Sequence, residues 1–114
     1  MEKMTLKTLI EDLDLTILTG KEHLEQEPKG AYTSDLLSDV MGNAQQNTLW
    51  ITSQVHKNIV AVASLKELLG IIIVNEREVS HDVLELAEEE NVAIIKSDMP
   101  AFETSGMLFD YLNQ

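Results

Sequence analysis

Apolar and polar positions along the chain change between helical and strand spacing. The chain opens with apolar residues spaced along one face of a helix, at Leu6, Leu9, Ile10 and Leu13. Thr5 stands directly before them and is expected to cap this helix. Residues 15–19 then alternate apolar residues with threonine up to Gly20, which predicts a short strand. The polar residues 21–29 are expected to form a surface connection.

After this connection, the pattern predicts a brief extended piece and a second helix. Residues 30–32 form the extended piece, and the helix is expected to run over residues 34–41 with Ser34 as its cap. Gly42 follows the last apolar residue of this stretch and suits the left-handed stop of a helix.

The second half of the chain alternates strongly apolar strands with helices. Strands are predicted at residues 49–52, 71–74 and 92–95. Helices are expected to start at Asn58, at Ser80 and, with Pro100 in the first turn, at Ser97 or Asp98. The helix from Asn58 is apolar on most sides up to Gly70, so we expect it to be buried on most sides. Short connections between strands and helices predict right-handed crossovers and an α/β fold, in which helices flank a mainly parallel sheet of about four to five strands in three layers.

Composition and charge narrow the function. The chain carries 20 acidic residues against 8 Lys and Arg, a formal net charge of −12. This charge excludes a nucleic-acid binder, which needs clustered basic residues, and disfavours an anionic membrane surface. The absence of cysteine excludes disulfides, thiol catalysis and thiolate metal sites. With 114 residues and no apolar run of signal or membrane-spanning length, the chain is expected to be one cytoplasmic domain over residues 1–114.

Polar loops follow the three predicted strands of the second half, and ligands of parallel α/β sheets bind outside the carboxyl ends of strands. These loops are residues 52–58, 75–78 and 96–98. The first lies directly before a helix N-terminus, whose unpaired amides favour an anion. It contains Lys57 and no acidic residue, so an acidic chain still offers a neutral-to-basic position for a small anion. Two simpler interpretations stay open, in which Asn58 is only a helix cap and His56 an ordinary loop histidine.

No catalytic signature accompanies these loops. The sequence has neither the Gly-rich dinucleotide motif nor a P-loop, and its three histidines lack metal-ligand spacing, so we expect no enzymatic activity, metal or cofactor. Asp35 and Asp39 stand four residues apart and would place two carboxylates on one helix face, which is also usual for a solvated helix start. An enzyme using Asp35 or His56 as its base would need a pocket that brings a carboxylate and an imidazole to one substrate position.

Several segments together resemble the DRTGG domain family over essentially the whole chain. They are residues 32–41, 49–52, 56–63 and 71–75, with Ser97-Asp98 and Phe102-Glu103. Family domains are similar to the N-terminal domain of HPr kinase/phosphorylase, and occur in some phosphate acetyltransferases and inorganic pyrophosphatases. The resemblance implies a regulatory module, sometimes dimer-forming, with catalysis in another domain. Stand-alone copies resemble small proteins encoded near iron-only hydrogenase and NADH-linked electron-transfer genes, which implies a larger redox enzyme as partner.

The chain departs from the family at the residues that give the family its name. As aligned, the Asp-Arg pair falls within residues 54–58 and the Thr-Gly-Gly at residues 75–77, and neither is kept. Side chains thus replace a flexible backbone that allows close approach, which implies a different ligand or none. The resemblance around residues 55–58 makes His56 and Asn58 the preferred binding residues. The full predicted set is Thr52, Gln54, His56, Asn58, Asn75 and Asp98.

Two functional hypotheses follow. The first is a non-catalytic regulatory module that binds a small anionic ligand, a nucleotide or a phosphorylated metabolite, at the carboxyl ends of the strands. The second is a homodimeric protein-interaction module that docks to a larger enzyme, such as a hydrogenase or an electron-transfer complex. Besides the family context, it is motivated by large apolar residues that a small chain cannot all bury, namely Tyr32, Trp50 and Phe109.

Overall fold

Within residues 4–114, which the computed structural model describes, five strands form one mixed sheet in the order β1-β5-β4-β3-β2. The strands are β1 (Thr16–Thr19), β2 (Ala31–Thr33), β3 (Leu49–Thr52), β4 (Gly70–Ile73) and β5 (Ala93–Lys96). Strands β2 to β5 run parallel, whereas β1 joins β5 antiparallel with a shift of register between Ile17 and Thr19. The predicted α/β fold with a mainly parallel sheet is confirmed. The first three residues of the predicted domain lie outside the described part.

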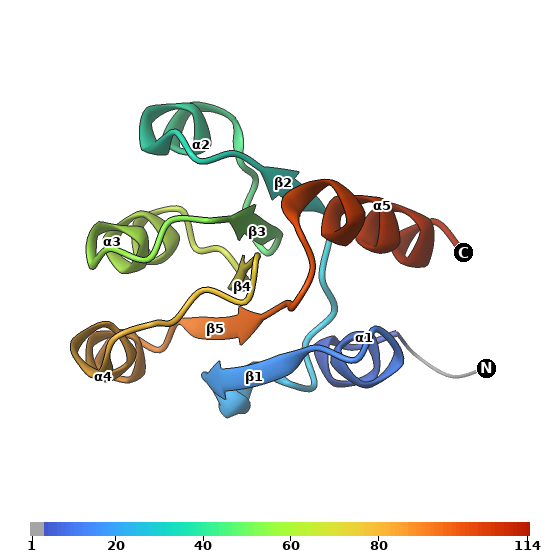
Figure 1. Ribbon diagram of the computed structural model, residues 1–114, viewed down its shortest axis with the longest axis horizontal. Coiled ribbons are helices and arrows are strands. Elements are labelled where there is room, and N and C mark those ends of the chain that lie inside the picture. The colour runs from blue at the N-terminus through green and yellow to red at the C-terminus, as the bar shows by residue number, and fades with distance from the viewer. Residues whose placement is uncertain (1–3) are drawn as a thin grey trace.

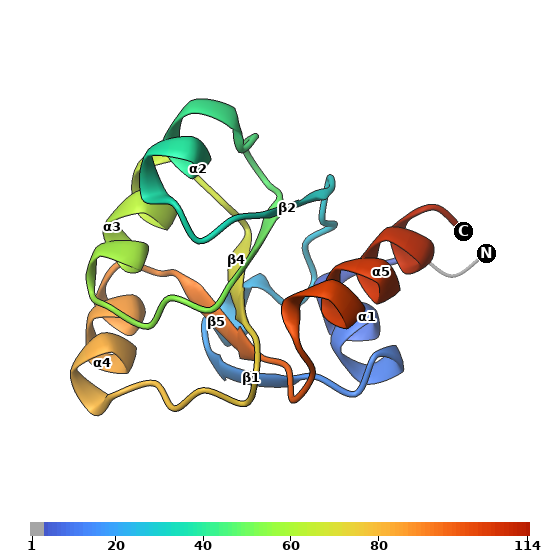
Figure 2. The ribbon, with the colours of Figure 1, turned by 45° about the horizontal axis from the view of Figure 1, so that its top comes forward.

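Helices cover both faces of this sheet, which gives three layers (Figure 1). One face carries α2 (Leu37–Asn43), α3 (Asn58–Leu65) and α4 (His81–Glu89). The other face carries α1 (Leu6–Asp12) and α5 (Ala101–Leu112), which are seen together in Figure 2. A short 3-10 helix (Lys21–His23) lies in the connection from β1 to β2. Among the described residues, no helix is long and apolar enough to cross a membrane.

Local signals in the sequence begin and end several of these elements as predicted. Thr5 caps α1, because its hydroxyl accepts from the Thr8 N–H at 3.3 Å while the Thr8 hydroxyl accepts from the Thr5 N–H at 2.9 Å. Ser80 caps α4 with its own hydroxyl. Gly20 ends β1 with a φ of 79°, and a Cβ there would lie 2.5 Å from the Ala93 Cα, so only glycine fits.

The start and end of α2 differ from the prediction. The helix begins at Leu37 and not at Ser34, because the Ser34 hydroxyl accepts the Leu36 N–H at 3.1 Å and forms a turn before the helix. Gly42 lies inside α2, which continues to Asn43, so the expected left-handed stop at Gly42 is wrong.

Two further helix boundaries also need correction. α3 ends at Leu65 and does not continue toward Gly70, because Glu67 takes a left-handed φ of 54° and turns the chain toward β4. Pro100 is the N-cap of α5 and not a residue of its first turn. The Ser97 hydroxyl accepts the Met99 N–H at 3.2 Å and so forms a turn ahead of this cap.

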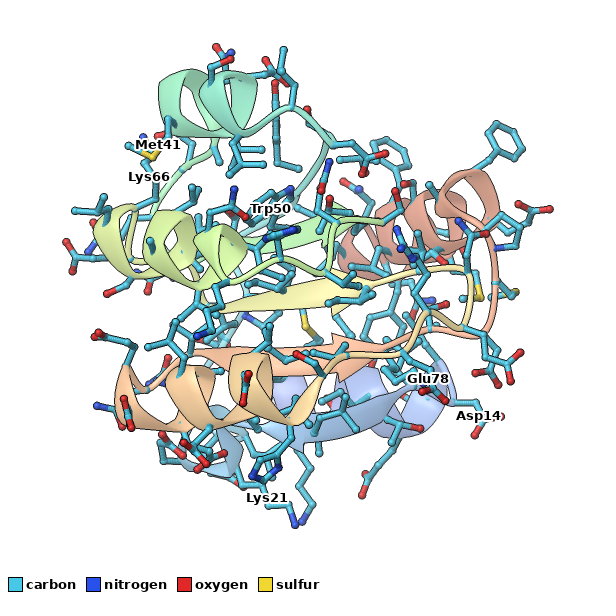
Figure 3. All side chains as sticks on the ribbon, turned by 60° about the vertical axis from the view of Figure 1, so that its left-hand side comes forward. Asp14, Lys21, Met41, Trp50, Lys66 and Glu78 are labelled. Atoms are coloured by element: carbon cyan, nitrogen blue, oxygen red, sulfur yellow. The ribbon has the colours of Figure 1, made fainter. Side chains whose placement is uncertain are left out.

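Two apolar cores lie on opposite faces of the sheet, one against α2, α3 and α4 and the other against α1 and α5. Trp50 belongs to the first core, is fully buried, and donates from its indole N–H to the Ser34 carbonyl at 2.8 Å (Figure 3). The expectation that Trp50 stays unburied is therefore wrong, because β3 is an inner strand and both of its faces are covered. Phe109 does remain at the surface, with 73% of its area exposed, and Tyr32 is half-buried.

Candidate functional site

The polar loops after β3, β4 and β5 lie together at the carboxyl ends of the strands, because these strands are parallel. Backbone hydrogen bonds join the loops after β4 and β5. The Asn75 N–H donates to the Met99 carbonyl at 2.9 Å, and the Glu76 N–H donates to the Ser97 carbonyl at 3.1 Å. Figure 3 shows Glu78, in the loop after β4, far from Lys66, which directly follows the C-terminal end of α3.

Asp35, which follows β2, organises the loop after β3. Its Oδ1 accepts the Thr52 hydroxyl at 2.8 Å and the Ser53 N–H at 2.7 Å, and its Oδ2 accepts the Ser53 hydroxyl at 2.9 Å. The backbone carbonyl of Asp35 accepts the Gln54 side-chain amide at 3.1 Å. One residue thereby holds three consecutive loop residues, of which Thr52 is only 1% exposed.

The pKa of the Asp35 carboxyl lies below its usual value. Partial desolvation raises this pKa, but the hydrogen bonds from Ser53 and Thr52, together with the charge of Arg77, lower it by more. The carboxylate is therefore ionised at neutral pH and is a weak proton acceptor, which argues against Asp35 as a catalytic base. Arg77, the only arginine of the chain, also donates from Nη1 to the Ser53 carbonyl at 2.7 Å.

Two consecutive residues after β4 have a left-handed backbone, Asn75 with a φ of 63° and Glu76 with a φ of 54°. They are the first two of the three positions, residues 75–77, at which the family resemblance places Thr-Gly-Gly. Glycine adopts a left-handed backbone freely, whereas here residues with side chains adopt it. Asn tolerates this conformation, whereas at Glu76 it costs about 1 kcal/mol. The turn leads directly into Arg77, whose guanidinium reaches the loop after β3.

α3 begins without a side-chain cap. Lys57 occupies the N-cap position and Asn58 is the first helical residue, so the interpretation of Asn58 as a simple cap is wrong. The Ile59 and Val60 N–H groups bond back to the carbonyls of His56 and Lys57 at 3.1 and 3.0 Å. The side chains of residues 56–58 are exposed. The partial positive charge of this helix start therefore faces solvent.

The predicted binding residues fall into two groups. Thr52 and Gln54 are held by Asp35 in the hydrogen-bond network of the protein itself. The other members are exposed and make no side-chain hydrogen bond to residues 4–114, namely His56, Asn58, Asn75 and Asp98. The second group is therefore available to a ligand, whereas the first positions the loop.

Sequence reasoning did not assign Asp35 and Arg77 to this network. Asp35 lies before α2, while Asp39 lies within it, so the two carboxylates do not share a helix face. Asp39 instead accepts the Tyr32 hydroxyl at 2.8 Å, and this hydrogen bond raises the pKa of Tyr32. The available signal was position, because Asp35 and Arg77 each follow the carboxyl end of a strand.

A groove of about 630 Å³ lies away from these loops, between β2 and α5. In the part of the chain described here, none of the four main hollows is lined by any of the six predicted binding residues. Residues 4–114 hold no group of three or more His, Asp or Glu side chains placed for a metal ion. A ligand at the carboxyl ends of the strands would therefore bind outside these four hollows.

Comparisons with known proteins agree with this fold. The pattern of the DRTGG domain matches residues 8–110. The crystal structure of the CBS and DRTGG domains of the regulatory region of Clostridium perfringens pyrophosphatase, complexed with its activator diadenosine tetraphosphate, is similar with a TM-score of 0.72 at 14% identity. The alignment covers 91% of this chain and 45% of that one, so this chain spans under half of its length. At this identity, the likeness shows the fold alone. A search of curated proteins finds no match.

Proposed function

This chain belongs to the DRTGG domain family, and we propose that it is a non-catalytic regulatory module that binds a small anionic ligand beside the N-terminus of α3. The observation that carries the proposal is the uncapped start of α3 next to a loop, residues 52–58, that has no acidic side chain in a chain of net charge −12. The positive end of the helix dipole attracts an anion, typically by about 0.3–1 kcal/mol at an exposed site.

The exposed side chains around this helix start have the chemistry of a phosphate site. Lys57 supplies a positive charge, and the Asn58 amide and the His56 imidazole supply hydrogen-bond donors. Asp98 is a hydrogen-bond acceptor at the carboxyl end of the neighbouring part of the sheet, after β5, and suits a hydroxyl or amine of a nucleoside. Asp35 acts through the loop that it holds, by positioning Thr52 and Gln54 without touching the ligand.

The nucleotide class has support from one solved relative. The pyrophosphatase regulatory region, which contains a DRTGG domain, is complexed with diadenosine tetraphosphate. We therefore rank nucleotides first among the candidate anions and phosphorylated metabolites second.

Calorimetric titration with inorganic phosphate, AMP, ATP and diadenosine tetraphosphate tests the proposal. We expect Lys57→Gln to weaken binding of the best of these probes by about tenfold, and Asn58→Ala and His56→Ala to weaken it further in combination. Lys66→Gln is the matched control, because it removes the same charge at the opposite end of the same helix. The proposal fails if none of the probes binds at millimolar concentration, or if the variants at positions 57 and 66 have equal effects.

A further inference from the structure

The groove between β2 and α5 lies along an open edge of the sheet. β2 is the outermost strand on its side. Backbone groups of Gly30 and Ser34 bond to β3 at 2.9 and 3.1 Å, so alternate residues of the strand face β3. The N–H and C=O groups of Ala31 and Thr33 therefore point away from the sheet, and within residues 4–114 they have no partner. Such an edge is a template for a further strand.

α5, which contacts β2 and lies next to it in Figure 1, forms the wall of this groove. Phe102 and Phe109 are 86% and 73% exposed and stand two turns apart on its groove-facing side. Between them, a Cβ at Gly106 would have no atom within 4 Å, so there is open space beside the helix at this position. The Thr33 and Ser105 hydroxyls bond to each other at 2.8 Å and tie the strand to the helix.

The opposite edge of the sheet offers no comparable surface. β1 carries the register shift between Ile17 and Thr19, and an irregularity of this kind protects an edge from pairing. Residues of β1 line neither this groove nor the three other hollows described for residues 4–114. The open edge and the exposed aromatic side chains therefore coincide only at β2.

Charge indicates the kind of occupant. Glu103 and Asp110 are exposed and directly follow Phe102 and Phe109 along α5. Among residues 4–114, Lys29 is the only charged residue that lines the groove. On the other face of β2, Tyr32 contacts the carboxylate of Asp39. A second copy of the chain would bring a further charge of −12, which opposes self-association. A basic partner has the complementary charge.

We propose that this groove binds an extended, basic segment of another protein, which pairs with β2 as an added strand. Apolar side chains at alternate positions of the segment pack against Phe102 and Phe109, and Lys or Arg side chains meet the surrounding carboxylates. This mode of recognition takes affinity from backbone hydrogen bonds and specificity from alternate side chains. It uses a surface separate from the loops beside α3.

The probe is a blocked synthetic peptide of alternating lysine and valine, compared with the same peptide carrying glutamate for lysine. Binding is followed by NMR of the ¹⁵N-labelled chain and by fluorescence anisotropy. We expect the lysine peptide to shift the Ala31 and Thr33 amide signals and to bind at least about tenfold more tightly than the glutamate peptide. N-methylation of alternate peptide nitrogens on the strand-facing side should abolish the binding.

Phe109→Ser should weaken the lysine peptide by about tenfold. Leu65→Ser is the matched control, because Leu65 has the same 73% exposure but lies in the opposite helix layer. Absence of amide shifts at millimolar peptide, equal affinity for both peptides, or equal effects of the two serine variants would overturn the proposal. Sedimentation that shows a dimer lost in Phe109→Ser would instead assign the groove to a second copy.

Discussion

Replacing Asp35 with alanine tests whether its carboxylate holds the loop after β3. The substitution removes the acceptor of the Thr52 hydroxyl, which is 1% exposed and cannot turn to water. A buried donor left without an acceptor costs about 1–3 kcal/mol. The Ser53 groups are only half-buried and can bond to water instead, so they add little. We therefore expect Asp35→Ala to lower the free energy of unfolding by about 2 kcal/mol, and most of this loss to come from Thr52.

Urea unfolding followed by circular dichroism measures this loss, which for a chain of this size corresponds to a melting temperature about 8 °C lower. Asp98→Ala removes an equal charge from an exposed residue without a side-chain partner, and it should change stability by less than about 0.5 kcal/mol. Thr52→Val added to Asp35→Ala should restore part of the loss, because the unpaired hydroxyl is then absent, while the half-buried Gln54 N–H loses this hydroxyl as its acceptor. Equal effects of the two alanine variants, or no restoration by valine, would refute the reasoning.

Three further predictions concern acid stability and backbone conformation. The folded-state pKa of Asp35 lies below the unfolded value of about 3.9. The stability that its carboxylate contributes is therefore present above about pH 3.9 and is lost as the pH falls through the folded-state pKa. We expect Asp35→Asn to lose less stability on acidification than the unchanged chain, as measured by urea unfolding at about pH 2–5. Gly20→Ala should lower the free energy of unfolding by more than about 2 kcal/mol, since its Cβ would meet the Ala93 backbone. Gly42→Ala, in open space on a helix, should raise it by about 0.5–1 kcal/mol, and thermal melts of both variants measure the two changes. Glu76→Gly should raise the urea midpoint, by about 0.5 kcal/mol in free energy, because glycine relieves the left-handed backbone; an unchanged or lower midpoint would contradict this account.

Signals that depend on neighbouring residues were readable from the sequence. The caps at Thr5 and Ser80, the turn at Gly20 and the apolar strands β3, β4 and β5 all follow from short patterns, because local hydrogen bonds and side-chain period determine them. The α/β fold follows from their alternation.

Features that depend on distant contacts were not readable. Asp35 reads as the first turn of a helix, yet its partners are residues 52 and 53, brought to it only when β2 pairs with β3. The sequence predicts Trp50 as an interaction residue, because it shows that the side chain is large but not that helices cover both faces of β3. The coming together of Arg77 and Ser53 likewise depends on the order of strands, which hydrophobic spacing alone does not specify.

The pairing of β1 with β5 has a consequence for the order of events during synthesis. The Thr19 hydroxyl donates to the Val92 carbonyl 73 positions later in the chain and accepts from the Ile94 N–H. On a ribosome these bonds cannot form until β5 has left the exit tunnel, so β1 waits for its partner strand while β2, β3 and β4 are made. Contacts of such long range slow folding and leave the early segments of a nascent chain open to chaperones.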